Sequence, residues 1–442
     1  MKLDNWLAQR AQSAPERTAL VADGSGVSYA ELEAEAAWVA RRLAAYGVRR
    51  GATVALTTRA GREQVVLIHA LMKLGAVTLP LSPRLSPAER AAVVAAEEPN
   101  VDLDDPARQL TQTEADLPLL GEHDMDDLQC RILTSGSTGP ARTVGLTYGN
   151  HLWSAVGSAF NIGVQPDDRW LCCLPLSHVS GLSIVLRSVI YGTTAVLHDG
   201  FDTDRVAAAL SDEGITVVSL VSTMLLRLLE ADADLAGPRL ILVGGGPVPE
   251  AALEAAVGRG ATVAQTYGLT EAASQVTTLA PTDAGRKLGS AGRPLLTTHV
   301  RLRDGEILVQ GPTVAPGCAD ADGWLHTGDL GRIDDEGFLY VEDRIDDLIV
   351  TGGENVVPAE VEAVLAGHPE VVDAAVVGRE DPEWQQAVTA VVVLRSGSEA
   401  TADDLRRHCA TTLAPHKVPK RVELASALPR TPSGKLMRRA LR

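Results

Sequence analysis

Short apolar runs alternate with helix-like segments along the first half of the chain. Arg62–Leu74 has the pattern of a helix, and the short apolar runs on either side of it predict strands. Strands that alternate with helices favour βαβ units around a mostly parallel sheet. The predicted elements are strands at Thr18–Ala22, Thr53–Thr57, Ala76–Leu81, Thr216–Val221 and Leu240–Val243, and helices at Arg62–Leu74 and Glu250–Gly258.

Capping residues mark the ends of two further helices. Ser28 and Glu31 form a capping-box pattern that opens a helix, and Gly47 can close it. Pro87 lies near the start of the other helix. These local signals place helices between the predicted strands, as a βαβ arrangement requires.

The pattern changes in the second half of the chain. From Arg301 to Gly331, short strands alternate with turns rich in Gly, Pro and Asp, which predicts a small β-rich subdomain. The charged stretch Asp343–Asp347 is the best candidate for a domain boundary. We therefore expect an N-terminal domain at residues 1–345 and a C-terminal domain at residues 346–442.

The segment after this boundary has its own small α+β pattern. Thr401 can cap a helix in which Leu405, Cys409 and Leu413 recur at four-residue spacing. The other predicted elements are a helix from Pro358 to about Ala366, ended by Gly367, and strands at Ala374–Val377 and Val388–Leu394. The fold class expected for the whole chain is α/β, with a small α+β domain at its end.

Length, charge and cysteine content narrow the classes of protein. At ~100–200 residues per domain, 442 residues predict two to four units. A formal net charge of −17 argues against a nucleic-acid partner but leaves ATP or coenzyme A open, because such sites use local cations and backbone donors. The five cysteines are odd in number and scattered, which favours buried thiols over disulfides or a metal site.

Targeting signals are not recognisable in the sequence. Met1–Gln12 carries charges and lacks the apolar core of a secretory signal. No apolar stretch approaches the ~18 residues of a membrane span. We therefore expect a cytoplasmic protein without a membrane partner; the oligomeric state stays open, with a homodimer among the alternatives.

A run of hydroxyl residues and glycines follows the strand-like segment Gln129–Leu133. Small side chains let backbone N–H groups approach a phosphate, hydroxyls add donors and a final cation adds charge. The run is not a Walker loop, because no lysine follows Gly139. Taken alone, such a run is more often a solvated turn than a phosphate site. It reads Thr134-Ser135-Gly136-Ser137-Thr138-Gly139-Pro140-Ala141-Arg142.

Further motifs follow this run in order. They are Leu174-Pro175-Leu176-Ser177-His178-Val179-Ser180-Gly181, Gly244-Gly245-Gly246-Pro247, Gln265-Thr266-Tyr267-Gly268-Leu269-Thr270-Glu271, Trp324-Leu325-His326-Thr327-Gly328-Asp329, Asp343-Arg344-Ile345-Asp346-Asp347, Gly352-Gly353-Glu354-Asn355 and Pro432-Ser433-Gly434-Lys435. In this order the set resembles the adenylate-forming superfamily: acyl- and aryl-CoA ligases, luciferases and peptide-synthetase adenylation domains. The resemblance runs from about residue 5 to the end of the chain.

The resemblance implies a carboxylate-activating enzyme that uses ATP, Mg²⁺ and coenzyme A. A carboxylate attacks the α-phosphate of ATP to give acyl-AMP and pyrophosphate, and a thiol then displaces AMP. A small C-terminal domain rotates between the two half-reactions. By resemblance, Ser135 through Gly139 hold the β- and γ-phosphates with help from Arg142, where the family commonly has lysine. Thr134 belongs to the same nucleotide site.

The motif that ends at Glu271 is expected to bind the metal and the nucleotide. Glu271 matches the family's magnesium ligand, and a hard cation that bridges phosphates prefers carboxylate oxygen; alone, it would be a solvated glutamate at a helix entry. By resemblance, Tyr267 stacks on adenine, and Thr270 acts together with Glu271. The same resemblance adds four residues to the nucleotide site: Gly245, Gly246, Gln265 and Thr266.

The remaining site residues come from the later motifs and from the apolar motif around His178. By resemblance, Asp329 accepts hydrogen bonds from the ribose hydroxyls, and Arg344 contacts ribose or phosphate. Lys435 reaches from the C-terminal domain into the site during adenylation, and His178 lines the acyl pocket. Gly352 and Gly353 shape the channel for pantetheine, where a side chain would block passage.

The acid substrate is indicated by the residues that continue past Glu271. The continuation Ala272-Ala273-Ser274-Gln275, the loop Gly244–Pro249 and the short chain resemble the o-succinylbenzoate–CoA ligases of menaquinone biosynthesis. A pocket for this acid needs donors for a second carboxylate. The expected donors are Ser274, Thr223 and His178, and Gln275 is either a further donor or a residue on a helix face.

Two other functions remain open at this point. One is another aryl or short-chain carboxylate–CoA ligase, and the other is an adenylation enzyme that loads a separate carrier protein. A hydrolase is excluded, because Ser137 and Ser180 lack the Gly-x-Ser-x-Gly frame.

Overall fold

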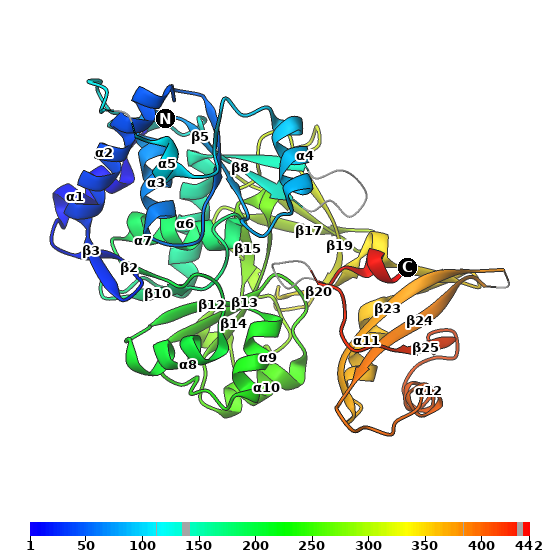
Figure 1. The fold of residues 1–442 in the computed structure, drawn as a ribbon. Coiled ribbons are helices and arrows are strands. Elements are labelled where there is room, and N and C mark those ends of the chain that lie inside the picture. Colours follow the sequence, from blue (N-terminus) through cyan, green and yellow to red (C-terminus); the bar gives the residue numbers. More distant parts are fainter. Residues whose placement is uncertain (112, 135–141, 383, 431–435) are drawn as a thin grey trace.

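Two large sheets and a separate C-terminal sheet organise the chain in a computed structural model (Figure 1). The structure describes residues 1–442 except 112, 135–141, 383 and 431–435. The phosphate-loop residues Ser135, Gly136, Ser137, Thr138 and Gly139 and the expected catalytic Lys435 lie outside the described residues. The α/β fold class predicted from the sequence is confirmed.

The larger sheet is mostly parallel, with antiparallel strands at its two edges. Its described strands, in spatial order, are β16 (Arg293–Pro294), β15 (Ser274–Thr278), β14 (Val263–Leu269), β13 (Leu240–Gly244), β12 (Val217–Val221), β10 (Arg169–Cys172), β11 (Thr194–Leu197), β2 (Thr18–Ala22) and β3 (Ser25–Ser28). Strands β2 and β10 to β14 pair in parallel, as predicted for βαβ units. Strands β3, β15 and β16 pair antiparallel.

The second sheet has the same mixed character. Its described strands, in order, are β6 (Val101–Leu103), β4 (Thr53–Thr57), β5 (Val77–Leu81), β8 (Leu128–Thr134) and β9 (Arg142–Thr147), of which only β9 is antiparallel to its neighbour. A short pair, β1 (Lys2–Asp4) and β7 (Glu122–Asp124), lies beside it in the chain's N-terminal region.

Helices cover both faces of the larger sheet. The helices of this part of the chain are α1 (Trp6–Ser13), α2 (Tyr29–Tyr46), α3 (Arg62–Leu74), α4 (Pro87–Glu97), α5 (Pro106–Gln109), α6 (Tyr148–Ile162), α7 (Val179–Tyr191), α8 (Thr203–Asp212), α9 (Ser222–Glu230) and α10 (Glu250–Gly258). Helices α2, α3, α6 and α7 share one core with both sheets, and α8 to α10 pack on the opposite face of the larger sheet. The capping box at Ser28 and the left-handed Gly47 that ends α2 are both present.

Two smaller sheets follow in the chain. The first contains β17 (His299–Arg303), β18 (Glu306–Gln310), β19 (Leu325–Ile333) and β20 (Leu339–Arg344), and packs against the turn η1 (Thr270–Ala272) and β15. The last sheet contains β22 (Glu354–Val356), β21 (Ile349–Thr351), β24 (Gln385–Leu394), β23 (Val371–Asp381) and β25 (Arg421–Leu424). The predicted β-rich stretch between Arg301 and Gly331 is therefore confirmed.

The C-terminal sheet has its own core and lies to one side of the rest of the chain (Figure 1). Helices α11 (Pro358–Ala366) and α12 (Ala402–Ala410) cover it. Short 3₁₀ turns complete the described elements: η2 (Pro281–Asp283), η3 (Ile345–Asp347) and η4 (Arg438–Leu441). Leu413 lies beyond the end of α12 but remains in the core. The division at residues 345 and 346 remains a proposal.

Candidate functional site

Residues from the predicted nucleotide motifs, and one predicted donor to the acid, gather where parallel strands of the larger sheet end. Gly244 is the last residue of β13, Thr223 lies in the first turn of α9 after β12, and Tyr267 lies in the neighbouring β14. In open α/β sheets, ligands bind outside the carboxyl ends of the strands. This edge of the sheet is therefore the candidate active site.

Tyr267, Asp329 and Arg344 form a chain of polar contacts across three strands. The Tyr267 hydroxyl donates a hydrogen bond of 2.7 Å to Asp329 Oδ2, and Arg344 Nε lies 3.1 Å from Asp329 Oδ1. Burial and the nearby Asp329 carboxylate raise the pKa of Tyr267 well above its usual value, so this hydroxyl remains a donor. The structure thus brings three predicted residues together and holds Asp329 in one orientation; each carboxylate oxygen retains a lone pair for a ribose hydroxyl.

The Glu271 carboxylate is well suited to bind a metal ion. Among the described residues it forms no side-chain hydrogen bond or ion pair, although it is only half exposed. It is close to Cys318, where burial and the Glu271 charge raise the thiol pKa. Mg²⁺ is commonly held by one or two carboxylates together with substrate phosphates and water. The described residues contain no group of three His, Cys, Asp or Glu that could hold a metal without such help.

A strained turn fixes the direction of the chain after Glu271. Ala273 and Ser274 have φ angles of 51° and 98°, in the left-handed region that side chains rarely adopt. A Cβ atom on Gly268 would lie 1.6 Å from the Ser274 carbonyl oxygen, so the hairpin of β14 and β15 closes only with glycine there. The turn is stabilised by Ser154, whose hydroxyl donates to the Ala273 carbonyl at 2.6 Å.

Gly245 and Gly246 lie in the connection between β13 and α10, where the backbone has free space beside it. Gly245 has a φ of 80°, and no atom lies within 4 Å of the Cβ position of Gly246. Close by in the sheet, Gln265 Oε1 is buried and has no hydrogen-bond partner in the structure. The Gln265 side chain can therefore accept a hydrogen bond from a ligand that occupies the space beside Gly246, and adenine carries such N–H donors.

The hydroxyl-rich loop is bounded by an antiparallel hairpin. Thr134 ends β8 and pairs with Arg142, which begins β9, and the Thr134 hydroxyl donates to the Arg142 carbonyl at 3.0 Å. Strand β9 contacts the η1 turn that carries Thr270 and Glu271. The described ends of the loop therefore lie on the same side of the molecule as the candidate metal ligand.

His178 precedes α7 and is largely buried. Burial lowers its pKa, so the imidazole is neutral near pH 7. It occupies the N-cap position of α7 without a side-chain capping bond. This placement agrees with a residue that lines a pocket, but its role stays a prediction.

Gly352 and Gly353 form the tight turn between β21 and β22. Both have positive φ angles, 59° and 85°, which suit a two-residue hairpin turn. Glycine is therefore needed here by the backbone itself, and the pantetheine channel stays a prediction.

The sequence-based interpretation of Gln275 needs a correction. Gln275 lies in strand β15 and is buried, so the alternative of a helix face is wrong. Its amide nitrogen donates to Thr266 Oγ1 at 3.2 Å and to Thr278 Oγ1 at 3.1 Å. Its amide oxygen accepts a hydrogen bond of 2.7 Å from Arg187.

Arg187 is a buried cation that the sequence analysis did not identify. It is 3% exposed and also donates to Ser154 at 2.9 Å, while its Nε atom has no partner among the described residues. Ser183, one turn earlier on α7, lies 3.5 Å from Ser274 through their hydroxyl oxygens. Spacing of four residues was the available signal, since it places Ser183 and Arg187 on the same face of α7.

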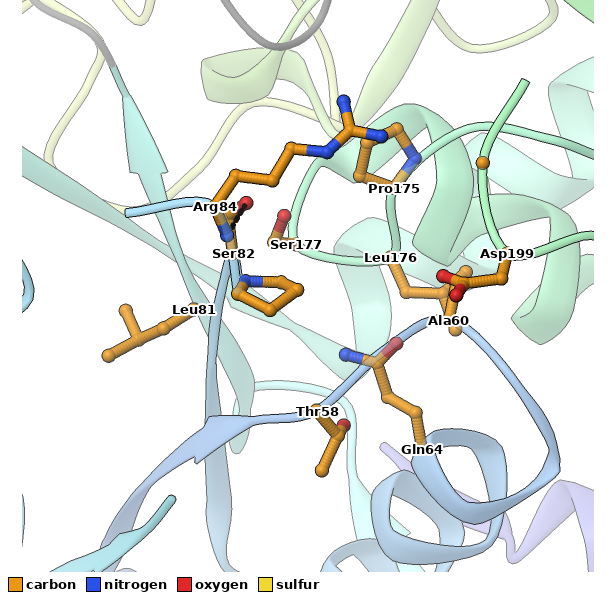
Figure 2. A pocket seen from close by; sticks show the side chains of 12 residues that line it. Thr58, Ala60, Gln64, Leu81, Ser82, Arg84, Pro175, Leu176, Ser177 and Asp199 are labelled. Atoms are coloured by element: carbon orange, nitrogen blue, oxygen red, sulfur yellow. Dashed lines mark hydrogen bonds between the residues drawn. The ribbon is translucent and has the colours of Figure 1, made fainter. Parts of the chain in front are cut away.

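A small cavity lies beside the site, between the two large sheets. Figure 2 shows Arg84 extending from the loop after β5 toward Pro175. The cavity measures about 40 Å³, which is room for little more than water. Its lining contains none of the predicted site residues; a second surface cavity of about 270 Å³, bordered by Trp153 and Pro312, also contains none.

Comparisons with known proteins cover the whole chain. The AMP-binding enzyme family matches residues 7–318, and the AMP-binding enzyme C-terminal domain matches residues 360–435. A 2-succinylbenzoate–CoA ligase from Bacillus cereus is 40% identical, over 100% of this chain and 98% of that enzyme.

Solved structures of o-succinylbenzoate CoA synthetase from Bacillus subtilis are similar in fold. The complex with the acyl-adenylate intermediate is 39% identical, with a TM-score of 0.92 over 100% of this chain and 98% of that one. The complex with ATP and magnesium is 38% identical, with a TM-score of 0.92 over 100% of both chains. A double mutant bound to a product analogue is 39% identical, with a TM-score of 0.76 over 100% of this chain and 98% of that one. The chain therefore belongs to the AMP-binding enzyme family, within the adenylate-forming superfamily.

Proposed function

We propose that the chain is an AMP-forming acid–thiol ligase that joins o-succinylbenzoate to coenzyme A, a step of menaquinone biosynthesis. The first half-reaction gives acyl-AMP and pyrophosphate, and the second gives o-succinylbenzoyl-CoA and AMP. The 40% sequence identity to a 2-succinylbenzoate–CoA ligase, which extends over the whole chain, supports this reaction. The similar solved structures include complexes with the acyl-adenylate and with ATP and magnesium.

The buried Arg187 is the observation that favours a dicarboxylic acid. Both groups that accept its hydrogen bonds, the Gln275 amide and the Ser154 hydroxyl, are neutral. Burial lowers the pKa of Arg187, and an uncompensated buried charge is costly. The second carboxylate of o-succinylbenzoate supplies the missing negative charge, whereas a fatty acid or benzoate has only the carboxylate that reacts.

The residues of the site have different roles in the reaction. Mg²⁺ held by Glu271 neutralises the phosphates of ATP during adenylation. Asp329, held by Tyr267 and Arg344, orients the ribose, and the open backbone at Gly245 and Gly246 accommodates the nucleotide. Fixed donors and charges of this kind act where negative charge accumulates in the transition state. Lys435 and the loop from Ser135 to Gly139 supply the remaining cations and donors by resemblance.

Other properties are proposed on the same basis. We propose that residues 1–345 bind ATP and the acid, that residues 346–442 move as a unit, and that the enzyme acts in the cytoplasm without a nucleic-acid partner. No helix among the described residues has the length and apolar character needed to cross a bilayer.

A panel of acids tests the proposed reaction. ATP-dependent pyrophosphate release is measured with o-succinylbenzoate, benzoate, a long-chain fatty acid and amino acids, each with and without CoA. We expect the highest specificity constant for o-succinylbenzoate, and thioester only when CoA is present. A higher value for an unsubstituted benzoate or a fatty acid contradicts the substrate but not the ligase chemistry. Acyl-AMP formation without transfer to CoA instead indicates an enzyme that loads a carrier protein.

A further inference from the structure

Asp343 is a buried carboxylate at the junction between the N-terminal part and the C-terminal sheet. It lies near the end of β20, and its side chain is 3% exposed. Asp343 Oδ2 accepts a hydrogen bond of 3.0 Å from the backbone N–H of Ala359, in the first turn of α11. Val357, the N-cap residue of α11, offers no side-chain capping bond. A residue on one side of the junction thus caps a helix on the other side.

Arg438 brings a positive charge to the same carboxylate. It forms ion pairs of 2.7 Å with Glu362 and 3.3 Å with Asp347, both in the C-terminal part, and lies 3.9 Å from Asp343. Burial raises the pKa of Asp343, and the Arg438 charge opposes that rise. Arg438 is therefore held mainly by its partners in the C-terminal part, and its longer contact with Asp343 reaches the N-terminal part.

In the part of the chain that the structure describes, these two contacts are polar links across the junction. Among the described residues, the only other hydrogen bond or ion pair between residues 1–345 and 346–442 is the local one from Leu348 N to the Ile345 carbonyl. The C-terminal sheet packs its apolar residues in its own core. Asp343 therefore makes both of the long-range polar contacts that the described residues form across the junction.

The fold of the whole chain is more similar to a nucleotide complex than to a product-analogue complex. The TM-score is 0.92 for the acyl-adenylate complex and 0.76 for the double mutant bound to a product analogue, at the same identity of 39%. The higher whole-chain similarity to the acyl-adenylate complex, together with the position of Asp343 at the junction, is the basis for linking this contact to adenylation.

We propose that Asp343 is a positioning residue that docks residues 346–442 in the orientation used for adenylation. The proposal rests on the two-step reaction proposed above. When the C-terminal part turns away for thioester formation, Asp343 loses the Ala359 N–H and Arg438. Its removal therefore disfavours the first half-reaction relative to the second.

The first measurement separates the two half-reactions in Asp343→Ala. Adenylation is followed by o-succinylbenzoate-dependent pyrophosphate exchange, and thioester formation by adding CoA to supplied acyl-adenylate. We expect adenylation to slow about fivefold or more relative to thioester formation, as the loss of one helix cap implies. Asp202→Ala is the matched control, because Asp202 caps α8 within the N-terminal part at 2.9 Å. Equal slowing of both half-reactions overturns the proposal.

The second measurement does not depend on the substrate. Spin labels on cysteines introduced at the exposed Glu254 and Glu399 report the distance between the two parts in the presence of ATP, with half-buried Cys318 changed to serine. Asp343→Ala is expected to add a second distance population that the Asp202→Ala control lacks. An unchanged distribution overturns the proposal. If the enzyme activates a different acid, this measurement still decides the role of Asp343.

Discussion

The buried cation Arg187 is the residue that links the fold to the proposed choice of acid. Its guanidinium group lies in α7, one turn after Ser183, and faces β15 immediately beyond the strained turn at Ser274. Among the described residues, its hydrogen bonds go to neutral groups, and its Nε–H has no partner. Such a cation gains more from an incoming carboxylate than a solvent-exposed arginine does, because water does not screen the interaction.

Replacing Arg187 by methionine is expected to reduce the enzyme's preference for a second carboxylate. The specificity constant for o-succinylbenzoate should fall at least about 100-fold, since breaking a buried ion pair costs about 3–5 kcal/mol. The value for benzoate should change little. Arg17→Met serves as control, because the side chain of exposed Arg17 donates, among the described residues, only to the Gly192 carbonyl. A proportional loss for both acids means that Arg187 supports the fold and does not select the substrate.

Residues of a continuous motif were easier to identify from the sequence than residues that make long-range contacts. Glu271 and Tyr267 belong to one continuous motif, so their neighbourhood was predictable. The contacts of Arg187 join residues 88 and 33 positions apart, and nothing in the pattern of α7 specifies them. Gln275 was ambiguous for the same reason, since its strand becomes evident only when β14 and β15 pair.

At the scale of elements, helices and strands with a clear apolar pattern were the most predictable part of the fold. Predicted helices Arg62–Leu74 and Glu250–Gly258 match α3 and α10, and strand β4 matches Thr53–Thr57. The predicted strand Ala374–Val377 is much shorter than β23, which continues to Asp381. Its polar end is held by pairing with β24, so local hydrophobicity does not reveal it.

A capping residue of α6 tests how strongly such end signals stabilise the fold. Buried Thr147 accepts a hydrogen bond of 3.1 Å from Asn150 N–H, and the Asn150 side chain also donates to the Pro312 and Val314 carbonyls. Thr147→Ala should destabilise the protein by about 1 kcal/mol, which lowers the thermal midpoint by roughly 1–3 °C. Exposed Ser25→Ala is the control. Equal midpoints for the two variants contradict a stabilising role of this cap.

At the scale of the whole molecule, the chain consists of a large part and a C-terminal part with a separate core. The charged stretch Asp343–Asp347 indicated this junction in the sequence, but not the long-range contacts from Ala359 and Arg438. Those contacts depend on the packing of complete elements, which no local pattern encodes.

Proline at Asp346 is expected to restrict the junction. Proline fixes φ near −65°, and Asp346 lies in the short turn η3 between the two parts. Adenylation should be largely retained, while thioester formation slows at least tenfold, equal to about 1.4 kcal/mol in barrier. Glu399→Pro, in an exposed loop of the C-terminal part, is the control. Wild-type thioester formation in Asp346→Pro places the pivot elsewhere.

The Asp343 contact also has an evolutionary consequence. Its two long-range partners meet on one side chain that belongs neither to the nucleotide residues nor to an apolar core. Under the proposed docking role, substitutions at this position change the balance between the two half-reactions without altering a residue of the nucleotide site. On this proposal, one substitution at residue 343 is enough to change which half-reaction limits turnover, while the active-site residues stay the same.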